Sequence, residues 1–496
     1  MRIFISALLI ILLNLQSSIS QEVELTDGCK EAYQSIIALK FNDARSILDQ
    51  EKEALPDNLY IPYLENYLDF LTIFIDEDEE QFNRLEENKS SRVDQIRKLD
   101  DSSAFRNYML GNIHLQWAVA RLKFREYFTA ALEINKAYRL LEKNEERFPD
   151  FVPNKISLGV LHVMIGMVPK KYHWLLNLIS MEGSVEQGRS ELAYVIRQSD
   201  SVKEYAYLKD ETLFYLAFID LNIQPDPERL EFLMQELKKK SNDNLLLSYL
   251  LANMMMRTGN NDEAIDVLTA AKNIPGTFPF YFLDYLTGEC YLRRLDTGAA
   301  DRSYRLFLSK FKGKNYKGDA YRKQGWISLF RQDTATYFQE MQNVIKFGNE
   351  DIDVDKEAMK EAEAETVPHI ELLKSRLLFD GGYYSKADSL LQTINTSGID
   401  RPQLVEIEYR KGRIDHKTGH IEMAKAHYKM VLELGSELPK YYAGNAALML
   451  GEIYESERDW KLARFYYETC LDLDFDEYEN SIHSKAQAGL ARLDDE

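Results

Sequence analysis

The sequence is poor in the residues that mark several common classes of protein. It holds only 3 cysteines, 12 prolines and 23 glycines in 496 residues. Three cysteines are too few for the disulfide framework of a small secreted domain, and we expect Cys29, Cys290 and Cys470 to be buried free thiols. The scarcity of turn residues, and of extended alternation of β-branched residues, argues against a β architecture.

The motifs of catalysis and metal binding are also missing. There is no His-Glu-x-x-His, no Cys-x-x-Cys, no phosphate-binding glycine loop and no Gly-x-Ser-x-Gly. The closest cluster of metal-ligating residue types is His416, His420 and His427 with Asp415, but a turn at Gly419 interrupts it. We therefore predict no catalytic residue, no metal site and no cofactor, and the chain is not expected to be an enzyme.

Basic residues are outnumbered by acidic ones. The 61 lysines and arginines face 81 aspartates and glutamates, which gives a formal net charge of −20. A chain of this charge repels phosphate backbones and anionic lipid surfaces. The expected partner is a protein or a peptide, and nucleic acid is not expected; the sequence does not indicate an oligomeric state.

Only the N-terminus carries an apolar run that points to targeting. Arg2 precedes the apolar residues 3–15, and the small-x-small tripeptide Ser18-Ile19-Ser20 follows. This run is shorter than the roughly 20 residues that cross a bilayer. It predicts a signal peptide at 1–20, cleaved before Gln21. We expect an exported protein that is periplasmic or secreted; the alternative is a retained anchor.

What the sequence does contain is a repeated pattern of small and aromatic residues. In residues 444–477, Gly451 and Ala463 stand at positions where two antiparallel helices approach closely, and Tyr454, Trp460 and Tyr467 fill the space beside them. These are tetratricopeptide-type positions. One such helix pair cannot bury its apolar face alone, so the pattern predicts stacked neighbours.

Weaker copies of the same pattern lie upstream. They contain Gly412, Gly419, Ala424 and Tyr428; Gly382, Tyr384, Ala387 and Leu391; Gly288, Tyr291, Ala300 and Tyr304; Ala252, Gly259, Ala264 and Leu268; Phe41, Ala44 and Leu48; and Tyr127, Ala130 and Ala137. The sequence therefore predicts an all-α fold, an α-solenoid of tetratricopeptide-like helix pairs.

Differences in composition divide the expected solenoid. We predict an N-terminal helical repeat block at 21–348 with an apolar insertion at 153–183, an acidic linker at 349–366, and C-terminal tetratricopeptide repeats at 367–496 that end in a capping helix over 482–493. The alternative for the acidic stretch is a solvated helix. The polar stretch 77–103 is expected to be a surface loop.

The apolar insertion is the most distinctive segment. An apolar helix ends at Pro169, a second apolar stretch follows, and glycines at 183 and 188 open a new helix pair. Residues 148–192 resemble a eukaryotic family of tetratricopeptide proteins that includes the inclusion-body clearance proteins, and also exported bacterial repeat proteins of unassigned function. The matching positions are Gly159, Pro169, Leu175, Leu176, Gly183, Gly188 and Leu192. The sequence departs from the eukaryotic pattern at 181–184 and in its export signal.

Two functions follow as hypotheses. The first is an exported, non-catalytic scaffold that binds proteins or peptides. The alternative is a carrier of lipid or a small apolar ligand, which would use residues 159–183 and make peripheral contact with membrane or lipid. Candidate partner-binding residues are Lys170, Lys171, Tyr172, Trp174, Leu175 and Leu176. The competing interpretation is that Leu161, Ile165, Leu175 and Leu178 pack in the core.

Overall fold

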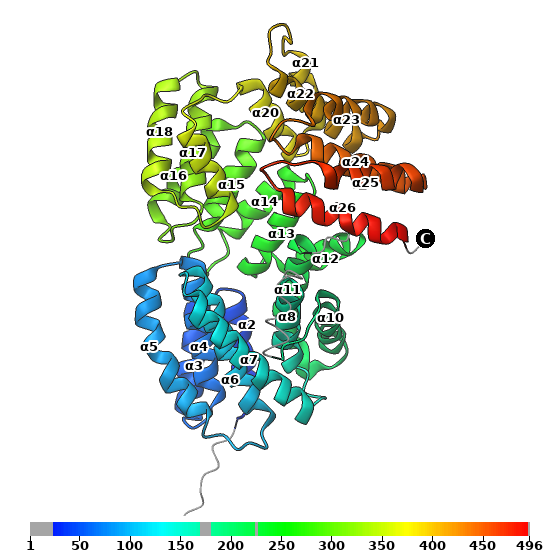
Figure 1. Ribbon diagram of the computed structural model, residues 1–496. Helices are drawn as coiled ribbons and strands as arrows, with labels where there is room; N and C mark the ends of the chain where they lie inside the picture. Colours follow the sequence, from blue (N-terminus) through cyan, green and yellow to red (C-terminus); the bar gives the residue numbers. More distant parts are fainter. Residues whose placement is uncertain (1–22, 169–179, 224–226, 495–496) are drawn as a thin grey trace, which may run out of the picture. The chain divides into compact units, whose positions relative to one another are not determined.

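The computed structural model describes residues 23–168, 180–223 and 227–494, and within these ranges it contains helices and no strand (Figure 1). The N-terminal helices are α2 (Asp27–Ile37), α3 (Phe41–Ala54), α4 (Tyr60–Asp76), α5 (Glu79–Ile96), α6 (Ala104–Lys123), α7 (Tyr127–Arg147) and α8 (Asn154–Gly166). They are followed by α10 (Val185–Ser201), the 3₁₀ helix η2 (Lys203–Leu208), α11 (Lys209–Asn222), α12 (Pro227–Lys240), α13 (Leu245–Arg257) and α14 (Asn261–Ala271).

The remaining helices carry the C-terminal repeats. They are α15 (Phe282–Arg293), α16 (Thr297–Lys310), α17 (Lys317–Phe330), α18 (Thr334–Phe347), α19 (Asp353–Glu363), α20 (Ile370–Asp380) and α21 (Tyr384–Gln392), then α22 (Arg401–Thr418), α23 (Ile421–Gly435), α24 (Tyr442–Ser456), α25 (Trp460–Asp472) and α26 (Glu479–Asp494). The predicted all-α fold is confirmed for the described residues. The predicted signal peptide at 1–20 lies outside them.

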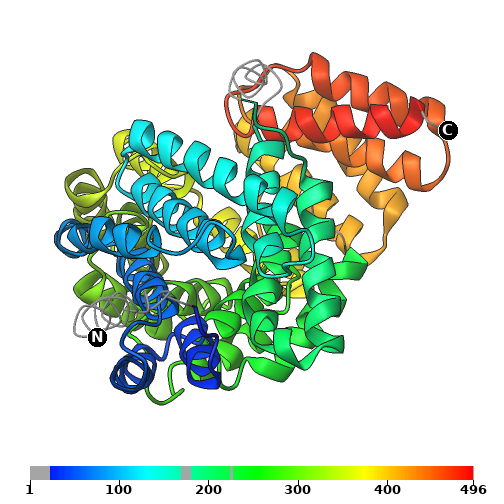
Figure 2. The ribbon, with the colours of Figure 1, turned by 90° about the horizontal axis from the view of Figure 1, so that it is seen from below.

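Contacts divide the chain into two compact units. Unit 1 consists of residues 1–254, 266–284 and 306–314, and unit 2 of residues 255–265, 285–305 and 315–496. In unit 1, α2 packs on α3, α6 on α7, and α8 on α10. In unit 2, α22 to α25 form two successive antiparallel pairs with α26 at the end, as Figures 1 and 2 show from two directions.

Close packing of glycine against an aromatic ring joins the two helices of several pairs. A Cβ built on Gly412 would lie 2.9 Å from Cδ1 of Tyr428, and one on Gly288 would lie 2.8 Å from Cε1 of Tyr304. Both tyrosines are completely buried. The sequence predicted close helix approach at these residues. The tyrosine ring leaves no room there for a side chain larger than a hydrogen atom.

Local sequence explains where the helices begin and end. The carboxylates of Asp400 and Asp459 accept hydrogen bonds from the backbone N–H of Gln403 and Leu462, which caps the N-termini of α22 and α25. Gly419 ends α22 with a φ of 82°, a left-handed conformation that glycine adopts without strain. The turn predicted at this glycine is confirmed.

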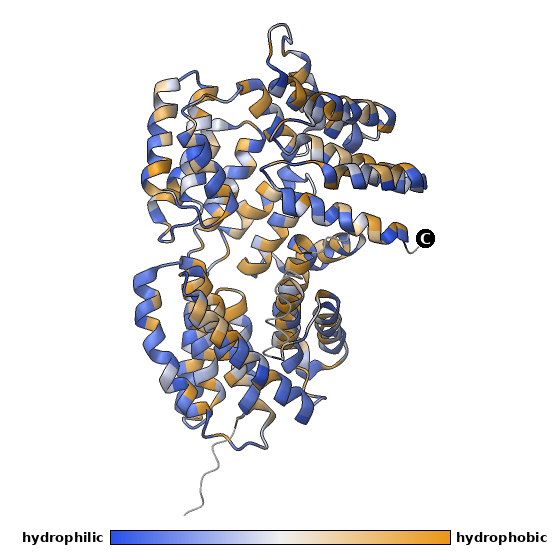
Figure 3. Cartoon of the chain, in the orientation of Figure 1, coloured by the Kyte–Doolittle hydropathy of each residue, from blue (hydrophilic) through white to orange (hydrophobic). Residues whose placement is uncertain are grey.

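Two polar segments are more ordered than their composition suggests. The stretch 77–103, expected to be a surface loop, contains α5; this expectation was wrong. In Figure 3 most of α5 is hydrophilic, but Phe82, Val93 and Ile96 are buried on one face of the helix. Residues 349–366, expected to be an acidic linker, contain α19, whose Asp355 and Ala358 are fully buried. The other predicted domain boundaries stay predictions.

All three cysteines are buried and free. The expectation for Cys29, Cys290 and Cys470 is therefore confirmed. Burial raises the pKa of the Cys290 and Cys470 thiols to about 12, because the protein interior disfavours the thiolate. No helix among the described residues combines the length and the apolar character that a membrane span requires.

Candidate functional site

The six residues that the sequence put forward for partner binding all lie at 170–176. This segment is outside the residues that the structure describes, so Lys170, Lys171, Tyr172, Trp174, Leu175 and Leu176 stay predictions. The described helices that precede and follow the segment in the sequence are α8 and α10, and these two helices pack on each other. Leu161 and Ile165 of α8 are buried, as the core-packing interpretation expected of them.

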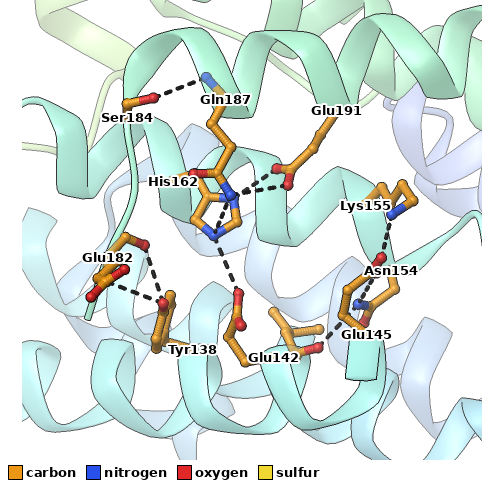
Figure 4. A network of polar contacts seen from close by, with 11 residues as sticks. Tyr138, Glu142, Glu145, Asn154, Lys155, His162, Glu182, Ser184, Gln187 and Glu191 are labelled. Atoms are coloured by element: carbon orange, nitrogen blue, oxygen red, sulfur yellow. Dashed lines mark hydrogen bonds and ion pairs between the residues drawn. The ribbon is translucent and has the colours of Figure 1, made fainter. Parts of the chain in front are cut away.

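A polar network links α7, α8 and α10 (Figure 4). His162 of α8 is almost completely buried, and its Nδ1 lies 2.8 Å from Glu191 Oε2 while its Nε2 lies 3.3 Å from Glu142 Oε1. Burial opposes the charge of His162, but the hydrogen bonds to Glu142 and Glu191 outweigh it and raise its pKa to about 9. The imidazolium therefore joins three helices at neutral pH.

The same network fixes the chain where it enters α10. The Tyr138 hydroxyl donates to the backbone carbonyl of Glu182 at 3.1 Å and accepts from the Glu182 N–H at 3.1 Å. At Gly166, the end of α8, a Cβ would lie 2.6 Å from the backbone nitrogen of Val185. The end of α8 thus touches the start of α10. We interpret the network as structural, since its polar groups bind one another.

The three histidines that came closest to a metal-ligand pattern in the sequence contact neighbouring polar groups. His427 Nδ1 lies 2.6 Å from Glu408 Oε2, and His420 Nδ1 lies 3.4 Å from Asp415 Oδ1. His416 is directed instead at the Tyr428 hydroxyl, 3.4 Å away. Within the described ranges, no group of three or more histidine, cysteine, aspartate or glutamate side chains has the geometry to hold a metal ion.

Many polar groups surround a groove in unit 2. A groove of about 770 Å³ is lined by residues of α15, α17, α19, α20, α22, α24 and α26 and of three loops. Its basic side chains are Arg293, Arg322, Lys323, Lys360, Arg376, Arg410, Arg413, Lys440 and Lys485. Its acidic side chains are Glu289, Asp353, Glu357, Glu361, Asp380 and Glu477, and its aromatic ones are Trp326, Phe379, Tyr409, Tyr441, Tyr442 and Tyr478. The groove is thus locally basic in an acidic chain.

On one side of the groove, acidic and basic side chains form ion pairs with one another. Asp319, fully buried below the wall, binds both Arg322 and Lys323, and the Lys323 ammonium also lies 2.5 Å from Glu289 Oε1. Burial disfavours the charge of Asp319, but Lys323 and Arg322 outweigh it and lower its pKa. Glu361 accepts hydrogen bonds from Trp326 Nε1 at 2.7 Å and from the Tyr337 hydroxyl at 3.2 Å.

The opposite rim is closed by a shared carboxylate. Glu477 lies 2.6 Å from the Lys440 ammonium and 3.3 Å from that of Lys360, so it connects α19 with the loop before α24. The ring of Tyr441 stands edge-on to that of Tyr478, with centroids 5.3 Å apart. Glu477 is buried, whereas 52% of Tyr478 is exposed. An aromatic surface therefore lies beside a neutralised charge.

Two arginines of the groove lie over aromatic rings and have no carboxylate partner among the described residues. Arg376 of α20 lies over the Trp326 ring at 4.9 Å, and Arg413 of α22 lies over the Phe379 ring at 5.1 Å. Arg413 also donates to the Tyr409 hydroxyl at 2.9 Å. Across the described part of the chain, no carboxylate lies within 4.0 Å of either guanidinium group. Both arginines are half-buried and remain able to bind an anion.

The sequence did not single out any of these groove residues. Of the repeat aromatics that the sequence did single out, Tyr428 and Tyr454 are buried, Tyr291 and Tyr384 are half-buried, and Trp460 is exposed. Arg376 and Arg413 are 37 positions apart in the printed sequence, close to one repeat length. That spacing is the only sequence signal that could have paired them.

With this geometry described, the chain can be compared with known proteins. Residues 135–275 match the family described as Iml2/Tetratricopeptide repeat protein 39. The match encloses residues 148–192, so the predicted resemblance to this family is confirmed, as is the tetratricopeptide type of the repeats. No curated protein matches the chain.

Solved helical-repeat structures also align with the chain over most of its length. The human IFIT1 dimer with PPP-AAAA is 12% identical, with 97% of each chain covered and a TM-score of 0.34. The crystal structure of yeast Tom70 is 12% identical, with 92% of this chain and 87% of that chain covered and a TM-score of 0.33. At these TM-scores the likenesses carry no argument about this chain.

Proposed function

Because the chain is a tetratricopeptide-type repeat protein, we propose that it is a non-catalytic scaffold that binds proteins or peptides in the groove of unit 2. The observation that carries this proposal is the lining of the groove. Part of that lining comes from α17, α20, α22 and α24, each of which is the first helix of a pair. An extended peptide in such a groove contacts several repeats at once.

The chemistry of the lining suits a polypeptide. The Tyr409 hydroxyl donates to Asn445 Oδ1 at 3.0 Å, and the side-chain NH2 group of Asn445 is a donor for a peptide carbonyl. The exposed ring of Tyr478 supplies a large contact area with few rotatable bonds, so it loses little conformational entropy on binding. Arginine and aromatic side chains are also the types that dominate binding energy in protein interfaces.

A substitution that blocks the groove with a large side chain tests this function. Ser481 is exposed on α26 and lines the groove, so Ser481→Trp should obstruct it; Gln487→Trp is the matched control, exposed on the same helix but outside the lining. Random-sequence peptides would be passed over each immobilised protein and the retained peptides identified by mass spectrometry. We expect wild type and Gln487→Trp to enrich the same peptides and Ser481→Trp to lose them. Equal enrichment by all three proteins would refute the groove as the site.

We also propose that the protein is exported and is periplasmic or secreted. The support is the apolar run 3–15 and the small-x-small tripeptide that follows it. Mass spectrometry of the mature protein tests this, because cleavage before Gln21 leaves a defined N-terminus. The alternative function, a carrier of lipid or a small apolar ligand through residues 159–183, remains a prediction, since residues 169–179 lie outside the described residues.

A further inference from the structure

Resting on the proposed function, we propose that the groove of unit 2 recognises an acidic peptide segment, and that Arg376 and Arg413 bind its carboxylates. This assigns a ligand class and two specificity-determining residues to the groove. Three observations support it: how the charges of the groove are paired, how the two arginines are held, and what the rest of the chain repels.

The pairing of charges is asymmetric. The buried acids of the groove already have cationic or hydrogen-bonding partners, as shown by Glu477 with its two lysines and Glu361 with Trp326 and Tyr337. Arg376 and Arg413, in contrast, contact aromatic rings and one phenol. A cation over a ring retains its capacity for in-plane hydrogen bonds. The groove therefore keeps cationic side chains that can still bind an anion.

The two arginines are preorganised. Trp326 is buried and hydrogen-bonded through its indole nitrogen, so the surface under Arg376 is fixed. Tyr409 is likewise buried and is held by Asn445, which fixes the phenol that binds Arg413. A guanidinium held in place loses less side-chain entropy when it binds a carboxylate with two parallel hydrogen bonds. A flexible surface arginine lacks this advantage.

The anchoring residues are on neighbouring repeats. Arg376 is on α20 and Arg413 on α22, and these helices pack on each other. A ligand that makes a two-hydrogen-bond contact with each arginine needs more than one carboxylate. A peptide with several aspartate or glutamate residues meets that requirement.

Nucleic acid is the competing polyanion, because arginine and aromatic rings also bind unstacked bases. Six acidic side chains line the same groove, and the chain carries a net charge of −20. A phosphate backbone carries a charge at every nucleotide, so this net charge disfavours it more than a peptide that carries only a few carboxylates. An acidic peptide places its few charges at side-chain spacing and has neutral amides elsewhere, which the acidic lining residues tolerate.

The test compares four probes on the mature protein by isothermal titration calorimetry. They are an acidic peptide of about ten residues, which spans roughly 33 Å when extended; the same peptide with a C-terminal amide; its isostere with glutamine and asparagine in place of the acids; and a single-stranded oligonucleotide. The protein variants are Arg376→Gln, Arg413→Gln and the double variant. Arg302→Gln, an exposed arginine of α16 outside the groove, is the control.

We expect the acidic peptide and its amidated form to bind wild type and Arg302→Gln alike. Each groove substitution should weaken binding by roughly tenfold, and the double variant by more. Binding of the neutral isostere with equal affinity would overturn the acidic specificity and leave the peptide function standing. Tighter binding of the oligonucleotide would overturn the ligand class. Binding by none of the probes, with no peptides retained in the library experiment, would overturn both proposals. Circular dichroism of each variant establishes that it is folded.

Discussion

The ring of Tyr467 fills the space that a Cβ on Gly451 would need, with the ring Cδ1 2.5 Å from that position. The same ring meets Gly489 of α26 on another edge, so one completely buried tyrosine joins three helices. This explains why the sequence requires glycine at 451 and an aromatic residue 16 positions later.

Gly451→Ala should therefore destabilise unit 2, although alanine is the better helix former. Overpacking of a core typically costs about 1–3 kcal/mol, which lowers the melting temperature by a few degrees in a domain of this size. Thermal unfolding followed by circular dichroism measures the shift. Gly298→Ala is the control, because its nearest neighbour is 3.7 Å from the new Cβ; an equal loss there would attribute the effect to the helix backbone and not to Tyr467.

The imidazolium of His162 should make unit 1 sensitive to alkaline pH. Its folded pKa of about 9 lies above the ordinary value of 6.5, so its contribution is fully present below pH 6.5 and is lost as pH rises through 9. The contribution is on the order of 2–3 kcal/mol. Urea unfolding of wild type and His162→Gln at pH 6 and pH 9.5 measures it. The difference between the two proteins should shrink at the higher pH; a constant difference would show that His162 is neutral.

The carboxyl group of Glu211, on α11, is expected to be protonated and neutral at pH values below its raised pKa. The hydroxyls of Tyr33 and Tyr67 donate to its two oxygens, and the residue is buried. Burial raises its pKa to about 8 against an ordinary value of 4.5, although a hydrogen bond from Tyr215 lowers it. The sign is the reverse of a paired carboxylate: the folded state binds the proton more tightly, so stability falls as pH rises from 4.5 to 8.

Glu211→Gln should remove that fall. The amide has the shape of the protonated acid and carries no charge to desolvate, so we expect a gain of roughly 1–3 kcal/mol at pH 8 and little change at pH 5. Chemical denaturation across this range measures both values. A variant that is less stable than wild type at pH 8 would mean that the two tyrosine hydroxyls stabilise a carboxylate.

Asp355 tests whether residues 349–366 act as a linker or as part of the core. Its carboxylate accepts hydrogen bonds from the backbone N–H of Tyr316 at 2.7 Å and of Asp319 at 2.9 Å. Asp355→Ala leaves those two donors unsatisfied at the start of α17 and should cost about 1–3 kcal/mol. Asp353, exposed on the same helix, provides the control: Asp353→Ala should change the melting temperature little. Similar small effects of both substitutions would favour the linker.

The sequence predicted the helix pairs because their signal is local. Gly288 with Tyr304, and Gly412 with Tyr428, stand at spacings that only a helical hairpin brings together, and the structure shows both contacts. The pair Gly325 and Tyr337, which joins α17 to α18, was missed. The position 16 residues after Gly325 holds Met341, whose Cε is the atom nearest to a Cβ there, at 2.8 Å. A methionine carries no aromatic signal, so the pattern did not reveal this pair.

The groove could not be predicted from the sequence, for a different reason. Arg376 and Arg413 each look like ordinary residues on a solvated helix, and nothing near them in the chain indicates that their partners are rings from other helices. Aromatic residues in a repeat pattern indicate core, and Tyr428 shows that they often are core. Which aromatic residues line a groove depends on how repeats stack, and stacking involves side chains more than 30 positions apart.

The contact between Gly166 and Val185 bears on how the protein tolerates insertions. Since the end of α8 touches the start of α10, and Tyr138 holds Glu182 beside them, the chain between these points leaves and returns at nearly one place. The entropy of closing such a loop grows only with the logarithm of its length, about 0.6 kcal/mol for each doubling. A reporter or a foreign epitope inserted between Val168 and Ser180 should therefore leave the packing of α8 on α10 intact.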